Sequence, residues 1–384
     1  MMSKSYPNEK PAEVPTLNQA RQEKARKYAQ ARRYLTAANL TLAGALLLAV
    51  IFSGLSVRFR ELLSLPVIPG VIIYFLLLTL SFGVLSAPID YYRGFVLPHR
   101  YGLSRQRFTG WLADEVKAGV ISLALSAGIV AALYWFITSL PSIWWLLSWG
   151  VVVLLSIILT NLAPIIIVPL FFKMKPLDNT DLKLRLEQLA QRAGLRASGI
   201  YTIDLSSKGN IANAALMGLG NTKRIVLSDT LLQQYSLPEI EIITAHELGH
   251  HLNSDTFRLL VIQSTIWLIG FYVTGLTLKF SVMPLGFSSI SDIAALPLLM
   301  LIFATFSLLV APLTTAYRRH LEVNADEYAL KLTGNPEAFI NAMTRLTDQN
   351  LAEAEPKRWI ELLSHDHPSY RRRVEHARRY LTSR

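Results

Sequence analysis

Long apolar runs alternate with charged segments along the chain. Six of these runs reach the roughly 20 residues that a helix needs to cross the hydrocarbon core of a bilayer. Several contain proline or glycine, which membrane helices tolerate because neighbouring helices satisfy the backbone groups that are freed. The pattern therefore predicts a mainly α-helical polytopic membrane protein with about six transmembrane helices, at residues 34–55, 67–87, 118–140, 143–172, 259–280 and 293–313.

The polar segments between these runs predict one further domain, which the membrane helices split in two. The first segment combines a helical leucine pattern, two strand-like runs and a second helix from about Pro238. The second segment reads as helices that are interrupted near Gly334 and at Pro368. We therefore predict a split α+β domain, in a chain divided into a basic tail (1–33), a four-helix membrane region (34–172), a first polar segment (173–257), two further membrane helices (258–316) and a second polar segment (317–384).

The basic residues are distributed unevenly between the two predicted sides of the membrane. Of the 38 lysines and arginines, 35 lie on one side, in residues 1–33, 88–117, 173–258 and 317–384. The other side keeps Arg58, Arg60 and Lys279. Lysine and arginine mark the cytoplasmic ends of membrane helices, so we predict that the tail and both polar segments are cytoplasmic.

Composition narrows the classes of function. Only 17% of the residues are charged, against roughly 25% in an ordinary soluble domain, and 52% are hydrophobic. The absence of cysteine excludes disulfides, iron–sulfur clusters and thiolate zinc sites. The basic residues show no aromatic interleaving and no binding-module signature, so we expect a lipid bilayer and no nucleic acid as a partner.

The strongest chemical signal is the run of residues 246–250, which reads His-Glu-Leu-Gly-His on the helix predicted from about Pro238. Residues four apart on a helix share a face, so the imidazoles of His246 and His250 can bind one zinc ion. Glu247 lies between them, where it can act as a base toward water at the metal. His251 lies one residue beyond this face, and we expect it to be exposed or structural.

A catalytic zinc site typically needs a third protein ligand and keeps one position open for water. Because the chain has no cysteine, the third ligand must be an aspartate, a glutamate or a histidine. The candidate segment follows the last predicted span and places Glu322 and Asp326 four residues apart on one helix face. One of these carboxylates suits the metal, and the other suits a hydrogen bond to a ligand histidine.

These motifs resemble those of the CAAX prenyl protease type 1 family, which are membrane-embedded zinc metallopeptidases of the gluzincin type. The resemblance rests first on residues 246–250 followed by Glu322-x-x-Ala325-Asp326. It extends to the segments 95–106, 171–177 and 213–231, and to His367-Pro368 with Arg373 six residues after the histidine. It implies a zincin-type catalytic domain and a large chamber enclosed by the membrane helices.

The resemblance also implies a role for each matching residue and a class of substrate. The implied ligands of one Zn²⁺ per chain are His246, His250 and Glu322, the implied base is Glu247, and Asp326 would orient a ligand histidine. Asn213 and Ala214 would lie beside the substrate backbone, with His367 and Arg373 at the active-site wall. From the mechanism we further expect His367 to be catalytic, as a hydrogen-bond donor to the oxyanion of the tetrahedral intermediate. The expected partners are peptides or proteins that are prenylated or membrane-associated.

Three alternatives predict a different protein. A protease with its zinc motif inside a membrane span is disfavoured, because polar residues such as Glu241 and Asp255 flank the motif too closely. A membrane quality-control zinc peptidase of the heat-shock type shares the zinc motifs but usually has fewer spans. A non-enzymatic membrane scaffold with a closed structural zinc site, with His367 as fourth ligand, has no use for Glu247.

Overall fold

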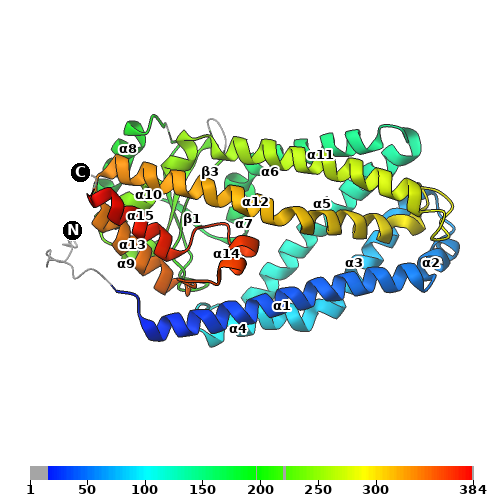
Figure 1. Ribbon diagram of the computed structural model, residues 1–384, viewed down its shortest axis with the longest axis horizontal. Helices are drawn as coiled ribbons and strands as arrows, with labels where there is room; N and C mark the ends of the chain where they lie inside the picture. Colours follow the sequence, from blue (N-terminus) through cyan, green and yellow to red (C-terminus); the bar gives the residue numbers. More distant parts are fainter. Residues whose placement is uncertain (1–15, 196, 219–221, 383–384) are drawn as a thin grey trace.

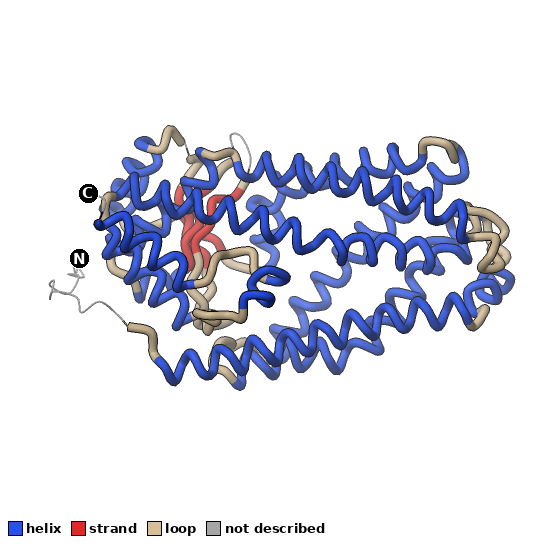
Figure 2. Tube along the Cα trace, in the orientation of Figure 1, coloured by secondary structure: helices blue, strands red, loops and turns tan. Residues whose placement is uncertain are grey.

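The computed structural model describes residues 16–195, 197–218 and 222–382; residues 1–15 of the predicted tail lie outside them. Figure 1 shows an elongated molecule whose long helices run along its longest axis, with shorter helices gathered at one end. Figure 2 places the strands within that same end, among helices. The architecture is therefore a helical membrane bundle that carries one α+β domain.

Six helical segments of the described chain are long and apolar enough to cross a membrane, which confirms the six predicted spans. Large apolar side chains such as Val84 and Leu309 are exposed along them, as expected for contact with lipid. The bundle consists of α1 (Gln19–Phe52), α2 (Leu55–Leu63), α3 (Val67–Tyr91), η1 (Tyr92–Val96), α4 (Leu97–Arg100), α5 (Phe108–Ser139), α6 (Trp144–Leu162), η2 (Ala163–Ile167), α7 (Val168–Phe171), α11 (Asp255–Ser281), η4 (Ile293–Ala295) and α12 (Leu296–Thr333). The segments η1 and η2 are single π-helical turns, and each lies near prolines. These turns join the helical segments on either side, so each span stays continuous.

Two of the spanning helices extend well beyond their apolar runs. The first, α1, begins at Gln19, so the later part of the predicted basic tail is helical. The last, α12, continues to Thr333 and ends where Gly334 adopts a left-handed φ of 64°, a common helix C-terminus. No proline or glycine occurs between Pro312 and Gly334 to end it sooner. Glu322 and Asp326 therefore lie on the same helix as the last membrane span.

The polar domain contains a four-stranded mixed sheet with the strand order β1-β2-β4-β3. Its strands are β1 (Met174–Pro176), β2 (Ile200–Ile203), β3 (Ala214–Met217) and β4 (Arg224–Ser228). β2 and β4 are parallel and confirm the two strand-like runs of the sequence, whereas β1 and β3 add antiparallel strands at the two edges. Among the described residues, β3 pairs with no strand other than β4, so its other edge is open to an extended peptide.

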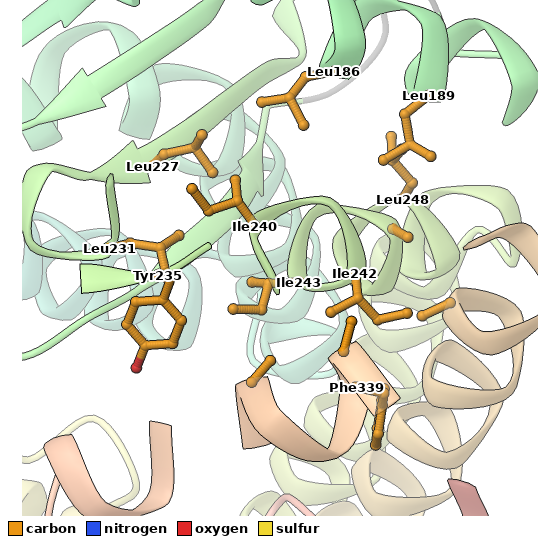
Figure 3. Packing of buried hydrophobic residues seen from close by; sticks show 14 of the residues in the cluster. Leu186, Leu189, Leu227, Leu231, Tyr235, Ile240, Ile242, Ile243, Leu248 and Phe339 are labelled. Carbon is orange, nitrogen blue, oxygen red and sulfur yellow. The ribbon is translucent and has the colours of Figure 1, made fainter. Parts of the chain in front are cut away.

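The polar end of the molecule also contains helices from both polar segments, and buried side chains of the two segments share one hydrophobic core. These helices are α8 (Thr180–Arg192), α9 (Asp229–Gln234), α10 (Leu237–Leu252), α13 (Pro336–Gln349), α14 (Arg358–Ser364) and α15 (Tyr370–Thr382). Figure 3 shows Leu186 of α8, Leu227 of β4, Ile240 of α10 and Phe339 of α13 meeting in the core. Each is almost inaccessible to solvent, and burial of such a side chain contributes about 1.5–3 kcal/mol.

The start of α10 is fixed by a capping box. The backbone N–H of Ser236 donates to the Glu239 carboxylate at 2.7 Å, and Pro238 occupies the first turn, where its missing N–H costs nothing. Glu239 is buried and also forms an ion pair with Arg345 of α13, whose Nε atom lies 2.9 Å from Glu239 Oε1. The helix that carries residues 246–250 is thereby held at its N-terminus as well as along its buried face.

A buried polar network closes the opposite end of the bundle. Arg60 of α2 lies 2.6 Å from the Asp292 carboxylate, which also accepts hydrogen bonds from the Ser288 and Ala294 backbone N–H groups. The Tyr134 hydroxyl donates to the Asp292 carbonyl oxygen at 3.3 Å. These bonds tie α2, α5 and the loop before α12 together, far from the polar domain in Figure 1.

The predicted orientation gives a labelling experiment, because the chain has no cysteine and each introduced cysteine is a unique reporter. The experiment replaces Glu61 on α2 and Asp181 on α8 by cysteine, one at a time. Both native side chains are largely exposed. We expect an impermeant maleimide to label Glu61→Cys in intact cells and Asp181→Cys only after lysis, because most basic residues lie on the side of Asp181. The reverse labelling pattern would contradict a cytoplasmic polar domain.

Candidate active site

The run of residues 246–250 lies in the last turns of α10, where this helix crosses α12. Gly249 makes the close crossing possible: a Cβ atom at this position would lie 3.1 Å from the Cα atom of Ala325 and 3.2 Å from the Cβ atom of Tyr328. The rings of His246 and His250 face the same side, with centroids 4.8 Å apart. The glycine and alanine thus bring the histidine face of α10 against the carboxylates of α12.

Glu322 of α12 completes a cluster with the two histidines. Its Oε2 atom lies 3.3 Å from the Nε2 atom of His246, and its Oε1 atom lies 3.3 Å from the Nε2 atom of His250. The three residues offer ligand atoms that all lie within 4.8 Å of one another. Glu322 Oε2 is buried without a hydrogen bond to any described residue. Two imidazoles and a buried, unsatisfied carboxylate form a donor set that fits Zn²⁺.

A second ring of charged groups holds the histidines. The Nδ1 atom of His246 lies 2.9 Å from Asp326 Oδ1, and the Nδ1 atom of His250 lies 2.9 Å from Asp255 Oδ2. Arg373 of α15 reaches Asp326 with two nitrogen atoms, at 2.8 and 2.5 Å. A carboxylate on Nδ1 fixes each imidazole with its Nε2 lone pair toward the ligand cluster.

Asp255 is a site residue that the motif analysis missed. It is almost fully buried and lies in the first turn of α11, just after the break between α10 and α11 at Ser254. The available signal was a lone aspartate five residues after His250, immediately beside a predicted membrane span. Its contact depends on the left-handed φ of 54° at Ser254, which no helical spacing predicts.

Glu247 projects from α10 toward the free edge of β3. Burial raises the pKa of its carboxyl group, while the nearby imidazoles of His246 and His250 and a backbone hydrogen bond from Leu216 of β3 oppose this shift in part. A carboxylate with a raised pKa beside two histidines is suited to accept a proton and to return it.

His367 approaches the cluster from the loop between α14 and α15. Its Nε2 atom lies 3.3 Å from Glu322 Oε2, and its Nδ1 atom lies 2.8 Å from Asp366 Oδ1. The loop is held by Arg319 of α12, whose guanidinium donates to the carbonyl oxygens of Glu361 and His365 at 2.8 and 2.5 Å. About half of the His367 side chain is exposed, so it faces open space beside the ligand cluster.

The free edge of β3 runs along two cavities that meet at Glu247. The larger, of about 1040 Å³, is lined by Asn213, Ala214, His367 and Arg373 and by residues of α1. The smaller, of about 410 Å³, is lined by Leu216, Gly218, His251 and Glu322 among others. Glu247 lines both. The structure thus brings together all nine residues singled out from the sequence, and it places His251 at the wall of the smaller cavity, partly exposed.

These features define a membrane metallopeptidase. They are a membrane-spanning bundle, a trio of residues that could hold a metal and is supported by carboxylates, and a glutamate beside a free strand edge. Comparison of the sequence with models of known protein families identifies the family. Residues 176–381 match the model of peptidase family M48, and residues 3–173 match the model of the CAAX prenyl protease N-terminal region with five membrane helices. The chain therefore belongs to peptidase family M48. Within residues 16–173 the structure describes four spans rather than five.

The relatives support this assignment over most of the chain. An uncharacterized metalloprotease, YhfN of Bacillus subtilis, is 30% identical over 360 residues, which is 92% of this chain and 84% of the relative. A CAAX prenyl protease 1 homolog of Arabidopsis thaliana is 29% identical over 301 residues, 76% of this chain and 71% of the relative. The crystal structure of S. mikatae Ste24p has the same fold, with a TM-score of 0.84 at 22% identity over 94% of this chain and 90% of that one.

Proposed function

We propose that this metallopeptidase is a zinc-dependent endopeptidase whose catalytic domain faces the cytoplasm and whose substrates are membrane-associated or prenylated proteins. The observation that carries the proposal is the convergence of His246, His250 and Glu322 beside Glu247, along a free strand edge. The substrate class is supported by the printed names of relatives, several of which are CAAX prenyl proteases.

The proposed roles of the metal site follow from its donor set. His246, His250 and Glu322 would hold one zinc ion, which when bound acts as a Lewis acid toward water and the scissile carbonyl group. Asp255 accepts a hydrogen bond from Nδ1 of His250, and Asp326 lies 2.9 Å from Nδ1 of His246. Each carboxylate favours a proton on Nδ1 and so leaves the Nε2 lone pair for the metal. Arg373 holds Asp326 in place.

The other residues of the site have proposed roles in binding the substrate and in hydrolysing the peptide bond. The free edge of β3, which begins at Ala214 just after Asn213, would pair with the extended substrate backbone. Glu247 would take a proton from the attacking water and later give it to the leaving amine. His367, at the open side of the cluster, would donate a hydrogen bond to the oxyanion of the tetrahedral intermediate.

The proposal is tested with the full-length protein purified in detergent. We expect elemental analysis to find about one zinc per chain, and mass spectrometry of a peptide library to find internal cleavages that a zinc chelator abolishes and added Zn²⁺ restores. A closed structural zinc site would give the same metal content without any cleavage. A protein with neither zinc nor chelator-sensitive cleavage would contradict the proposal itself.

His367→Ala distinguishes an oxyanion donor from a fourth zinc ligand. We expect kcat on one cleavable peptide to fall about 10²–10³-fold, as for other oxyanion donors, while KM and the zinc content stay close to those of the wild type. The matched control is His376→Ala, which removes a histidine of α15 that does not line either cavity. Loss of zinc would instead identify His367 as a ligand, and an unchanged kcat would remove it from the mechanism.

A further inference from the structure

The smaller of the two cavities at the active site carries positive charge that the proposed mechanism does not use. Lys223, His251 and Arg318 line it together with the site residues Glu247, His250 and Glu322. Because those three site residues form part of its wall, the cavity opens directly onto the position where the peptide bond would be cleaved. A substrate side chain next to that bond would enter this cavity.

Three different elements hold Lys223, Arg318 and His251 at this wall. The carbonyl oxygen of Lys223 accepts two hydrogen bonds from Ser198, from its N–H and its hydroxyl, each at 2.8 Å. This fixes the backbone just before β4. Arg318 lies four residues before Glu322 on α12, so both share one helix face. His251 follows the last residue of the histidine motif on α10.

Lys223 has no carboxylate partner among the described residues that line this cavity, whereas the Asp366 carboxylate interacts electrostatically with Arg318. The Lys223 ammonium lies 2.8 Å from the Nδ1 atom of His251, and within the described residues neither Lys223 nor Arg318 forms an ion pair. Asp255 and Asp366, which also line the cavity, are paired with histidines. Burial lowers the pKa of Lys223, as expected for an ammonium that lacks a negative partner.

We propose that Lys223, with Arg318 and His251, forms a subsite that binds a carboxylate of the substrate next to the cleaved bond. This inference rests on the proposed peptidase function. Lysine has three donors: one contacts His251, and the other two have no hydrogen-bond partner among the described residues, so a carboxylate can accept from them. Both an acidic side chain and a free C-terminal carboxylate have the required chemistry. Hydrogen bonds between charged groups in a half-buried site are roughly twice as strong as neutral ones.

The test uses peptides that differ in one group. In blocked peptides, glutamate and the isosteric glutamine are exchanged at each position around the cleaved bond, and a second series compares a free C-terminal carboxylate with its amide. We expect one position, or the free terminus, to give a kcat/KM about tenfold to a hundredfold higher for the carboxylate, from a charge-assisted hydrogen bond of about 1.5–3 kcal/mol. The position that responds identifies the source of the carboxylate.

Variants of Lys223 show whether this residue causes the preference. Lys223→Met should abolish the preference while leaving kcat/KM for the neutral peptide within about threefold, and Lys223→Arg should retain it. The control Lys183→Met removes an exposed lysine of α8 and should change neither value. Equal rates for carboxylate and amide peptides in the wild type, or a preference that survives in Lys223→Met, would overturn the subsite.

A binding measurement tests the carboxylate subsite separately from the proposed peptidase function. In the Glu247→Gln background, fluorescence anisotropy measures the dissociation constants of the same labelled peptides without cleavage. The carboxylate peptide should bind more tightly than its amide partner, and Lys223→Met should remove the difference. Equal binding would overturn the subsite even if the peptidase is confirmed. Selective binding without wild-type cleavage would overturn the peptidase function and retain the carboxylate site.

Discussion

Glu247→Gln is expected to lower kcat for peptide cleavage by about 10²–10⁴-fold, the usual contribution of a general base, while the zinc content stays near one ion per chain. Glutamine keeps the size and hydrogen-bonding capacity of the side chain but cannot accept the proton of the attacking water. Glu247 does not belong to the trio of His246, His250 and Glu322, so its replacement leaves the metal site complete. The measurement combines elemental analysis with kcat on one peptide.

Glu241→Gln provides the control for this experiment, because Glu241 lies on the same helix and faces Arg185 of α8 at 3.5 Å. This variant should keep both zinc and activity. A Glu247→Gln protein that cleaves at the wild-type rate would exclude Glu247 as the base. Loss of zinc in that variant would mean that Glu247 takes part in metal binding.

Glu322→Ala is expected to lose most of the bound zinc and, with it, the activity. The carboxylate of Glu322 lies 3.3 Å from the Nε2 atom of His246 and 3.3 Å from that of His250, and it is the proposed third ligand beside them. Glu327→Ala removes a carboxylate of the same helix that pairs with Lys331 at 2.6 Å and is partly exposed. It should keep its zinc.

The two alanine variants are compared by zinc content after identical purification and dialysis. Similar metal content in Glu322→Ala and Glu327→Ala would remove Glu322 from the ligand set. The third ligand would then have to come from another group near the two histidines, such as His367, whose Nε2 atom already lies 3.3 Å from the Glu322 carboxylate.

The parts of the site that the sequence predicts are those that helical spacing determines. The four-residue spacing places His246 and His250 on one face, and the same spacing places Asp326 one turn beyond Glu322. The long apolar runs likewise predict the spans, because the thickness of the bilayer sets their length. Each of these predictions needs only local geometry and the chemistry of the side chain.

The remaining features depend on contacts between distant segments. Asp255 reaches His250 only because the chain turns at Ser254, and Arg319 holds the His367 loop across 46 residues. The role of Gly249 appears only once α12 lies against it. The edge strand β3 is short, and its four residues Ala-Ala-Leu-Met carry no alternating pattern that would predict it.

The position of Glu322 on α12 has a consequence for how the enzyme is made. During synthesis the histidines of α10 emerge first, and the proposed third ligand, Glu322, follows only after α11 and most of α12 have been translated. The His367 loop and Arg373 come later still. A nascent chain with only the first polar segment would therefore lack part of the proposed metal centre. The order of the segments makes the proposed centre, and with it peptidase activity, dependent on synthesis of the α11–α12 hairpin.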